Sequence, residues 1–196
     1  MLLIYRVMWR LLIPVIMRCN GVVVGKGTRF YGVPLLAKCD KSTIIIGKNS
    51  TLCSVSIMTA LGLSHSVVLR TLFADSVISI GDDTGISGGT ICAAQRVTIG
   101  DRCLIGANVT IVDTDFHTEN PTGRHKDSNI FDVKVKPVSI EDDVFIGTGS
   151  IILKGVRIGR NSIIGAHSVV VTSIPANAIA AGNPAKVIRF IDNVIK

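Results

Sequence analysis

Aromatic and charged residues are both scarce in this chain of 196 residues. Aromatic residues make up 5% of it and charged residues 18%, below the roughly 25% charge of an ordinary globular domain. These shortages argue against a core of packed rings and favour one of stacked isoleucine, valine and leucine. The net charge of +7 favours anionic partners, but no basic run alternates with aromatic residues, so no nucleic-acid partner is expected.

Cysteine occurs without any of the spacings that metal sites or disulfide scaffolds use. The five cysteines are odd in number and contain no Cys-x-x-Cys pair; they are Cys19, Cys39, Cys53, Cys92 and Cys103. A zinc knuckle and a disulfide scaffold are therefore not expected, and no metal site is predicted. Reduced thiols are typical of a cytoplasmic protein, which is the location that we expect.

The amino-terminal segment lacks an unbroken apolar run. Residues 1–17 are strongly apolar, but Arg6, Arg10 and Arg18 recur at helical spacing. A membrane-spanning helix needs about 20 mainly apolar residues, so we predict an amphipathic helix over residues 1–20. This helix either caps the open end of a core, which we favour, or lies on a membrane surface as a peripheral contact through residues 1–18.

The chain does contain a repeat with a period of six. From position 140 every sixth residue is aliphatic, and a small or β-branched residue follows four positions later. The aliphatic positions are Ile140, Ile146, Ile152, Ile158, Ile164 and Val170, and the small ones are Val144, Ser150, Val156, Ser162 and Ser168. The same phase occurs upstream in Ile99, Ile105 and Ile111, in Ile80, Ile86 and Cys92, in Ile46, Leu52 and Met58, and in Val24, Phe30 and Leu36. Cys92 thus takes an aliphatic position and Cys103 a small one, so both are expected to be structural.

A period of six fits neither a helix of 3.6 residues per turn nor an antiparallel sheet with a period of two. It predicts short strands separated by tight bends, three of which make one triangular coil with the aliphatic residue pointing inward. Stacked coils bury the apolar faces that a single repeat leaves exposed. We therefore predict an all-β fold, a parallel β-helix over residues 21–185.

The repeat is lost between Ile111 and Ile140. The intervening sequence is polar and carries Pro121 and Pro137, so it is predicted to protrude from one corner of the coils as a loop over residues 112–139. Loops on a rigid scaffold are a usual place for function. This one opens with the sequence Asp-Thr-Asp-Phe-His, which ends at His117.

The repeat and the loop together resemble the hexapeptide-repeat acyltransferases, in particular the maltose, galactoside and capsular polysaccharide O-acetyltransferases. The resemblance extends over the stretches DVFIGTGSIILKGVRIG, NSIIGAHSVV and IPANAIAAGNPAKVIR. It implies a β-helix that winds left-handed, acetyl-CoA as co-substrate, and a homotrimer with active sites between subunits. It also implies that His117 is the catalytic residue.

The resemblance further implies that CoA lies along a groove between neighbouring subunits. It puts the contacts with CoA on Phe145, Thr148, Ala166, Val171, Thr172, Lys186 and Arg189. Val171 and Thr172 stand where the relatives carry Thr-Lys, so the lysine contact is lacking at that point. Residues 186–196 are predicted to form a short carboxy-terminal helix.

Histidine suits acetyl transfer to a hydroxyl. The hydroxyl must lose its proton as it attacks the thioester, and a histidine, which titrates near neutrality, can take that proton and pass it to the departing thiolate. Asp113 and Asp115, at the loop entry, are candidates to orient the imidazole. Ser87 and His125 are candidate contacts with the acceptor, whereas His167 is expected to face outward as a bystander.

The sequence favours an acetyl-CoA-dependent O-acetyltransferase that acts on a sugar hydroxyl of a surface or capsular polysaccharide or its precursor. The alternatives are an N-acetyltransferase acting on an amino sugar and a non-catalytic β-helix assembly protein. A metal hydratase resembling the γ-class carbonic anhydrases would need a His-x4-His pair, whereas the nearest spacing here is His117-x7-His125.

Overall fold

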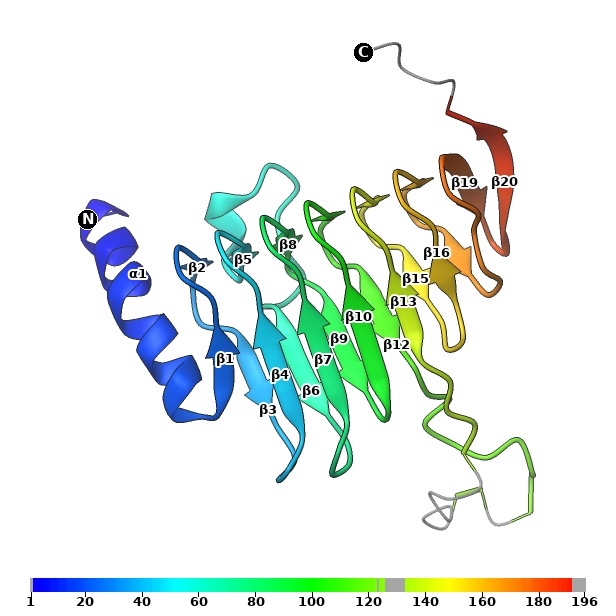
Figure 1. Ribbon diagram of the computed structural model, residues 1–196, viewed down its shortest axis with the longest axis horizontal. Coiled ribbons are helices and arrows are strands. Elements are labelled where there is room, and N and C mark those ends of the chain that lie inside the picture. The colour runs from blue at the N-terminus through cyan, green and yellow to red at the C-terminus, as the bar shows by residue number, and fades with distance from the viewer. Residues whose placement is uncertain (1, 123, 126–132, 192–196) are drawn as a thin grey trace.

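The computed structural model is a left-handed parallel β-helix, a three-sided prism of stacked coils with a helix across one end (Figure 1). The structure describes residues 2–122, 124–125 and 133–191. Each coil contributes one short strand to each of three parallel sheets, here called sheets A, B and C in chain order. The chain therefore turns around three edges of the prism in every coil. The A/B edge lies between sheets A and B, the B/C edge between sheets B and C, and the C/A edge between sheet C and sheet A of the next coil.

From β1 to β18 the strands of sheets A, B and C follow one another in strict rotation along the chain, and β19 and β20 then both join sheet B. Sheet A contains β1 (Val22–Val24), β4 (Thr43–Ile46), β7 (Val77–Ile80), β10 (Arg96–Ile99), β13 (Val138–Ile140) and β16 (Arg157–Ile158). Sheet B contains β2 (Arg29–Tyr31), β5 (Thr51–Cys53), β8 (Gly85–Ser87), β11 (Leu104–Ile105), β14 (Phe145–Ile146), β17 (Ile163–Ile164), β19 (Ala178–Gly182) and β20 (Ala185–Phe190). Sheet C contains β3 (Leu35–Ala37), β6 (Val68–Thr71), β9 (Thr90–Ala93), β12 (Thr110–Val112), β15 (Ile151–Ile152) and β18 (Val169–Val170).

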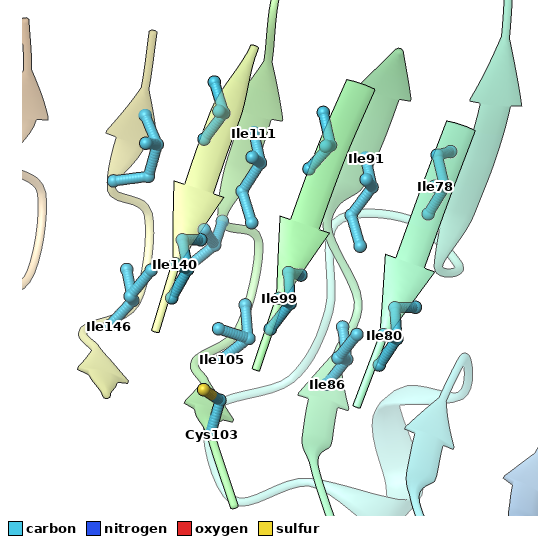
Figure 2. Packing of buried hydrophobic residues seen from close by; sticks show 14 of the residues in the cluster. Ile78, Ile80, Ile86, Ile91, Ile99, Cys103, Ile105, Ile111, Ile140 and Ile146 are labelled. Atoms are coloured by element: carbon cyan, nitrogen blue, oxygen red, sulfur yellow. The ribbon is translucent and has the colours of Figure 1, made fainter. Parts of the chain in front are cut away.

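The aliphatic residues of the repeat form vertical columns inside the prism. In sheet A, for example, Ile80 is in register with Ile99, Ile99 with Ile140, and Ile140 with Ile158. All six aliphatic positions predicted from residue 140 onward are at most 2% exposed. Figure 2 shows isoleucines of successive coils stacked in this way. The predicted fold and its inward-facing positions are confirmed here.

The predicted phase is wrong at two places, and both lie on the B/C edge. Ile91, not Cys92, is in register with Ile111 (Figure 2), because Gly88 and Gly89 shorten the step from Ile86 to five residues. Met58 lies in a short 3-10 helix, η1 (Ser56–Met58), within an insertion over residues 54–67, and Leu69 takes the inward position instead. An insertion outside the prism leaves the core period intact, so the repeat resumes after it.

The small residues at the A/B edge bond one coil to the next. The hydroxyls of Thr28, Ser50 and Thr84 donate to the glycine carbonyls of the following coil, at 2.7, 2.8 and 2.9 Å. The Cys103 thiol takes the same place and donates to the carbonyl of Glu141 at 3.1 Å. Burial raises the pKa of this thiol to about 11, which keeps it a neutral donor. Cys103 is therefore structural, as predicted.

Glycine at the same edge is required by the close approach of neighbouring coils. A Cβ added at Gly81 would lie 2.5 Å from the carbonyl carbon of Gly100, whereas one added at Gly85 would meet only the Leu104 side chain, at 3.6 Å. Gly81→Ala is expected to lower the free energy of unfolding by about 2–3 kcal/mol, since the backbone of the next coil must move. Gly85→Ala serves as the matched control and should stay within about 0.5 kcal/mol of the parent chain. Urea unfolding of both variants tests this, and equal stabilities would contradict it.

The helix α1 (Leu2–Cys19) lies across the first coil and contacts β1 and β2 (Figure 1). Ile13 and Met17 are buried in the core cluster, and Trp9 packs against it. The favoured prediction of a capping helix is therefore confirmed. No helix among the described residues has the length and apolar character needed to cross a membrane.

The prediction of a carboxy-terminal helix is wrong for the part of residues 186–196 that the structure describes. Residues 185–190 form strand β20, which pairs antiparallel with β19 after a turn at Gly182. The reason is that β19, the last parallel strand of sheet B, has a free edge whose N–H and C=O groups the returning chain can pair. Residues 192–196 lie outside the described residues.

Candidate active site

The protruding loop leaves the prism at the C/A edge, between β12 and β13 (Figure 1). Its two arms pair at the base, where Asp115 donates its N–H to Lys134 and Lys136 donates to Asp113, and Thr114 bridges Val135. The Lys134 ammonium and the Glu119 carboxylate, 2.6 Å apart, link the arms further out. The predicted loop is thus present and has an ordered base. Residues 123 and 126–132 of it lie outside the described residues.

Asp113 anchors the loop to the prism. Its side chain is fully buried, and its carboxylate accepts the backbone N–H groups of Ala94, Gln95 and Arg96 at 2.6, 2.7 and 2.7 Å. These three donors come from the turn of the preceding coil, so the carboxylate satisfies backbone groups that the sheets leave unpaired. Asp113 is therefore engaged in backbone bonds and does not reach the imidazole of His117.

Asp115 is likewise paired elsewhere. One of its carboxylate oxygens lies 2.6 Å from the ammonium of Lys154, and both side chains are about three-quarters buried, at 30% and 24% exposed. Lys154 follows β15 in the next coil, so the pair links the loop to the prism. No pattern in the sequence pointed to Lys154, because it lies outside the loop and off the six-residue period.

His117 is exposed at the start of the outer loop. It shares an open hollow of about 430 Å³ with Pro121, Arg124 and His125. No side chain among the described residues hydrogen bonds to its imidazole. The structure therefore brings His117 and His125 together and adds Arg124, a cation that sequence reasoning did not single out.

Phe116 directs the chain toward this hollow. Its backbone has a φ of +63°, an uncommon conformation for an aromatic residue, and its N–H donates to the Thr114 hydroxyl at 3.2 Å. The Phe116 side chain lines a separate apolar hollow of about 240 Å³, together with Leu72, Phe73, Thr114, Val133 and Val135. The exposed histidine is thus flanked by an apolar surface on one side and a basic, open surface on the other.

Three of the residues predicted to contact CoA lie along the B/C edge. Thr148 is half-buried, and its hydroxyl donates to the carbonyl of Ala107 at 2.7 Å. Ala166 is exposed one coil later, and a Cβ at Gly147 would lie 2.5 Å from its nitrogen, so the two coils touch closely here. Lys186 follows on β20, paired with Ala181. This edge is therefore a ridge of small residues ending in a cation.

Phe145 and Arg189 lie on the adjoining outer face of sheet B. Phe145 is in register with Ile163, Ile163 with Ile179, and Ile179 with Arg189. Three strand spacings separate the first from the last, which corresponds to about 14 Å. Phe145 is 44% exposed, and both side chains face solvent.

Val171 and Thr172 are not brought to that ridge. They follow β18, exposed on the C/A edge, which is also the edge from which the His117 loop departs. Ser87, in contrast, ends β8 on the B/C edge beside the 54–67 insertion, whose Ser64 N–H donates to Asn108 at 2.8 Å. The two groups of predicted site residues thus occupy two different edges of the prism.

The other titratable candidates have structural surroundings. His167 is exposed on the B/C edge, as predicted, with its ring over Gly149. Burial, and to a lesser degree the nearby Asp113 carboxylate, raise the pKa of the Cys92 thiol to about 11. No group of three or more metal-binding side chains occurs in the described part of the chain.

Comparisons with known proteins agree with this architecture. Residues 137–172 match the family model "Bacterial transferase hexapeptide (six repeats)", and residues 96–112 match "Hexapeptide repeat of succinyl-transferase". Galactoside O-acetyltransferase of Lactococcus lactis is 38% identical over 62% of this chain and 51% of its own length. The chain spans about half the length of the curated relatives that it matches.

Two solved structures share the fold over nearly the whole chain. A galactoside acetyltransferase in complex with coenzyme A superposes with a TM-score of 0.59 and 26% identity, covering 96% of this chain and 78% of that one. AntD, an N-acyltransferase of Bacillus cereus in complex with dTDP and 3-hydroxybutyryl-CoA, gives a TM-score of 0.61 at 21% identity, covering 91% and 88%.

Proposed function

We propose that this hexapeptide-repeat protein is an acetyl-CoA-dependent O-acetyltransferase in which His117 is the general base and the acceptor is a sugar hydroxyl. The observation that carries the proposal is the position of His117. It lies exposed, in an open hollow, on the loop that leaves the prism between β12 and β13. The relatives named as galactoside O-acetyltransferases support both the acyl donor and a carbohydrate acceptor.

The separation of the site residues over two edges favours an active site between copies of the chain. The B/C edge carries Ser87, Thr148, Ala166 and Lys186, whereas the C/A edge carries the His117 loop. In a closed ring of subunits related by one rotation axis, the C/A edge of each prism would lie against the B/C edge of the neighbouring prism. We therefore propose a homotrimer in which CoA and His117 meet at the subunit interface.

The chemistry needs only a base and a place for the thioester. The hydroxyl oxygen of the acceptor attacks the acetyl carbonyl while an imidazole nitrogen of His117 takes its proton. The carbon–sulfur bond then breaks, and the same proton passes to the departing thiolate of CoA. Because the thiols of Cys92 and Cys103 are buried and their pKa values are raised, we expect no acyl-cysteine intermediate.

Lys186 and Arg189 are proposed to bind the phosphates of CoA. Replacing both with alanine should weaken CoA binding about tenfold or more, since charge-assisted bonds to phosphate contribute about 1.5–3 kcal/mol each. Isothermal titration calorimetry measures the loss. Arg160→Ala, on the A/B edge of the prism, removes another exposed cation and should leave the affinity unchanged. An unchanged affinity in the double variant would contradict the assignment.

The second candidate is acetyl transfer to the amine of an amino sugar, which would use the same base and the same groove. This second candidate is retained because AntD, which shares the fold, is named as an N-acyltransferase. Purified full chain with acetyl-CoA should release free thiol in the presence of a glycan, and the comparison of hydroxyl-only and amino-sugar acceptors separates the two reactions. No thiol release with any acceptor, together with no CoA binding, would favour a non-catalytic assembly protein.

We also propose a cytoplasmic location, where acetyl-CoA is made. A surface or capsular polysaccharide precursor would be available there as an acceptor. Fractionation of cells that express the tagged full chain tests this placement.

A further inference from the structure

The outward face of α1 is apolar and uncovered. While Ile13 and Met17 point into the prism, the opposite side of the same turns is exposed. The residues of this outer apolar face and their exposed fractions are Leu11 66%, Leu12 54%, Val15 53% and Ile16 47%. One helix thus has two apolar sides, and only one is used by the fold.

A basic groove runs beside this face. It has a volume of about 440 Å³ and lies between α1 and the first coil. Its lining includes Arg10 and Arg18 from the helix and Lys26 and Arg29 from the coil, and no carboxylate. Arg18 is held by a 2.9 Å bond from its guanidinium to the carbonyl of Val24. None of the four cations forms an ion pair within the described residues.

We propose that the helix-covered end of the prism docks on the surface of an anionic phospholipid bilayer. In this arrangement α1 lies in the plane of the interface, Leu11, Leu12, Val15 and Ile16 enter the boundary of the acyl chains, and the four cations bind headgroup phosphates. An apolar stripe flanked by lysine and arginine is the pattern of interfacial helices, and anionic lipids add attraction for each basic side chain near the surface.

The positive charge of this surface favours a bilayer over a second copy of the chain as its partner. In a two-fold contact the same patch meets itself, so Arg10, Arg18, Lys26 and Arg29 would face their own counterparts with no carboxylate to compensate. An anionic surface, in contrast, is complementary to all four at once. Capping and membrane contact are therefore not exclusive, because they use opposite sides of α1.

The docking would orient the rest of the molecule. Figure 1 shows α1 at one end of the prism and β20 at the other, so the long axis would rise from the membrane. The loop that carries His117 leaves the side of the prism before β13, the fifth of the six strands of sheet A, and would therefore face the solution away from the membrane. This inference concerns placement and does not depend on the acetyl-transfer activity.

Sedimentation of the full chain with vesicles tests the proposal. Vesicles of phosphatidylcholine containing about 30% phosphatidylglycerol should bind the chain at least tenfold more tightly than phosphatidylcholine alone, and added salt should weaken the binding. Equal binding to both kinds of vesicle, or no binding to either, would overturn the proposal.

Two variants test the two parts of the surface. Leu12→Ser combined with Val15→Ser, and separately Arg29→Glu, should each lower the affinity for the anionic vesicles about tenfold. Ile188→Ser, on β20 at the far end, and Arg70→Glu, on β6, make matched changes elsewhere and should bind like the parent chain. Unchanged melting temperatures show that the variants fold. If the α1 variants bind vesicles normally but change the oligomeric state, the face belongs to a second copy and the proposal fails.

Discussion

His117→Ala is expected to lower kcat for acetyl transfer about a hundred- to ten-thousandfold, which is the usual contribution of a general base. The affinity for CoA should not change, because the residues proposed to bind CoA lie on β14, β20 and the turns at the B/C and C/A edges, outside the loop. His117 is exposed and no described residue hydrogen bonds to its ring, so the variant should fold normally. Rates of thiol release at saturating acetyl-CoA measure the effect.

Two other histidines supply the controls for this experiment. His125→Ala changes the same hollow and should affect mainly KM for the acceptor, since we place it as a contact and not as the base. His167, whose ring packs over Gly149, is placed as a bystander, so His167→Ala should leave kcat unaltered. A His117→Ala enzyme that turns over at the parent rate would remove the central residue of the mechanism.

Asp113→Ala is expected to have the largest effect on stability, about 3–5 kcal/mol in the free energy of unfolding. The substitution leaves the N–H groups of Ala94, Gln95 and Arg96 without their acceptor at a partly buried turn. Each unsatisfied buried donor costs about 1–3 kcal/mol, and water can reach only part of the site. Such a loss is a large share of the 5–15 kcal/mol that typically holds a domain folded.

Asp115→Ala is the matched control, two residues away in the same loop arm. Its carboxylate pairs with one partly exposed ammonium, that of Lys154, so the expected loss is about 1 kcal/mol or less. Urea unfolding followed by circular dichroism gives both values. If the two variants unfolded at the same urea concentration, the anchoring role of Asp113 would be refuted.

The core of this fold can be read from the sequence because burial enforces the period. An inward residue such as Ile140 must stack on Ile99 and Ile158, so its neighbours in the column are fixed at one coil above and below. The small residues at the bends follow from the same geometry. Cys103 was predicted to be structural on this ground, and its bond to the carbonyl of Glu141 gives the physical reason.

The errors arise where the chain leaves the column. Met58 lies in an insertion at the B/C edge, where extra residues extend outside the prism and no core contact sets their phase. The strand β20 depends on pairing with β19, a contact between chain segments that local propensity does not encode. The role of Asp113 could not be assigned either, since its three partners lie about 18 positions earlier in the sequence.

The candidate site was predictable in part. The loss of the repeat located the loop, and the resemblance located His117 within it. The division of the site residues between the B/C and C/A edges became visible only in three dimensions, because the six-residue period does not distinguish one edge from another. The salt bridge between Lys154 and Asp115 also required the structure.

Transfer of an isotope-labelled acetyl group from acetyl-CoA to a hydroxyl-bearing glycan tests the central claim most directly. Mass spectrometry of the glycan after incubation with the full chain should show the added mass of a labelled acetyl group. Mild base should then remove the label, because an ester hydrolyses under conditions that leave an amide intact. A glycan that gains no label, or gains one that resists mild base, would contradict the account.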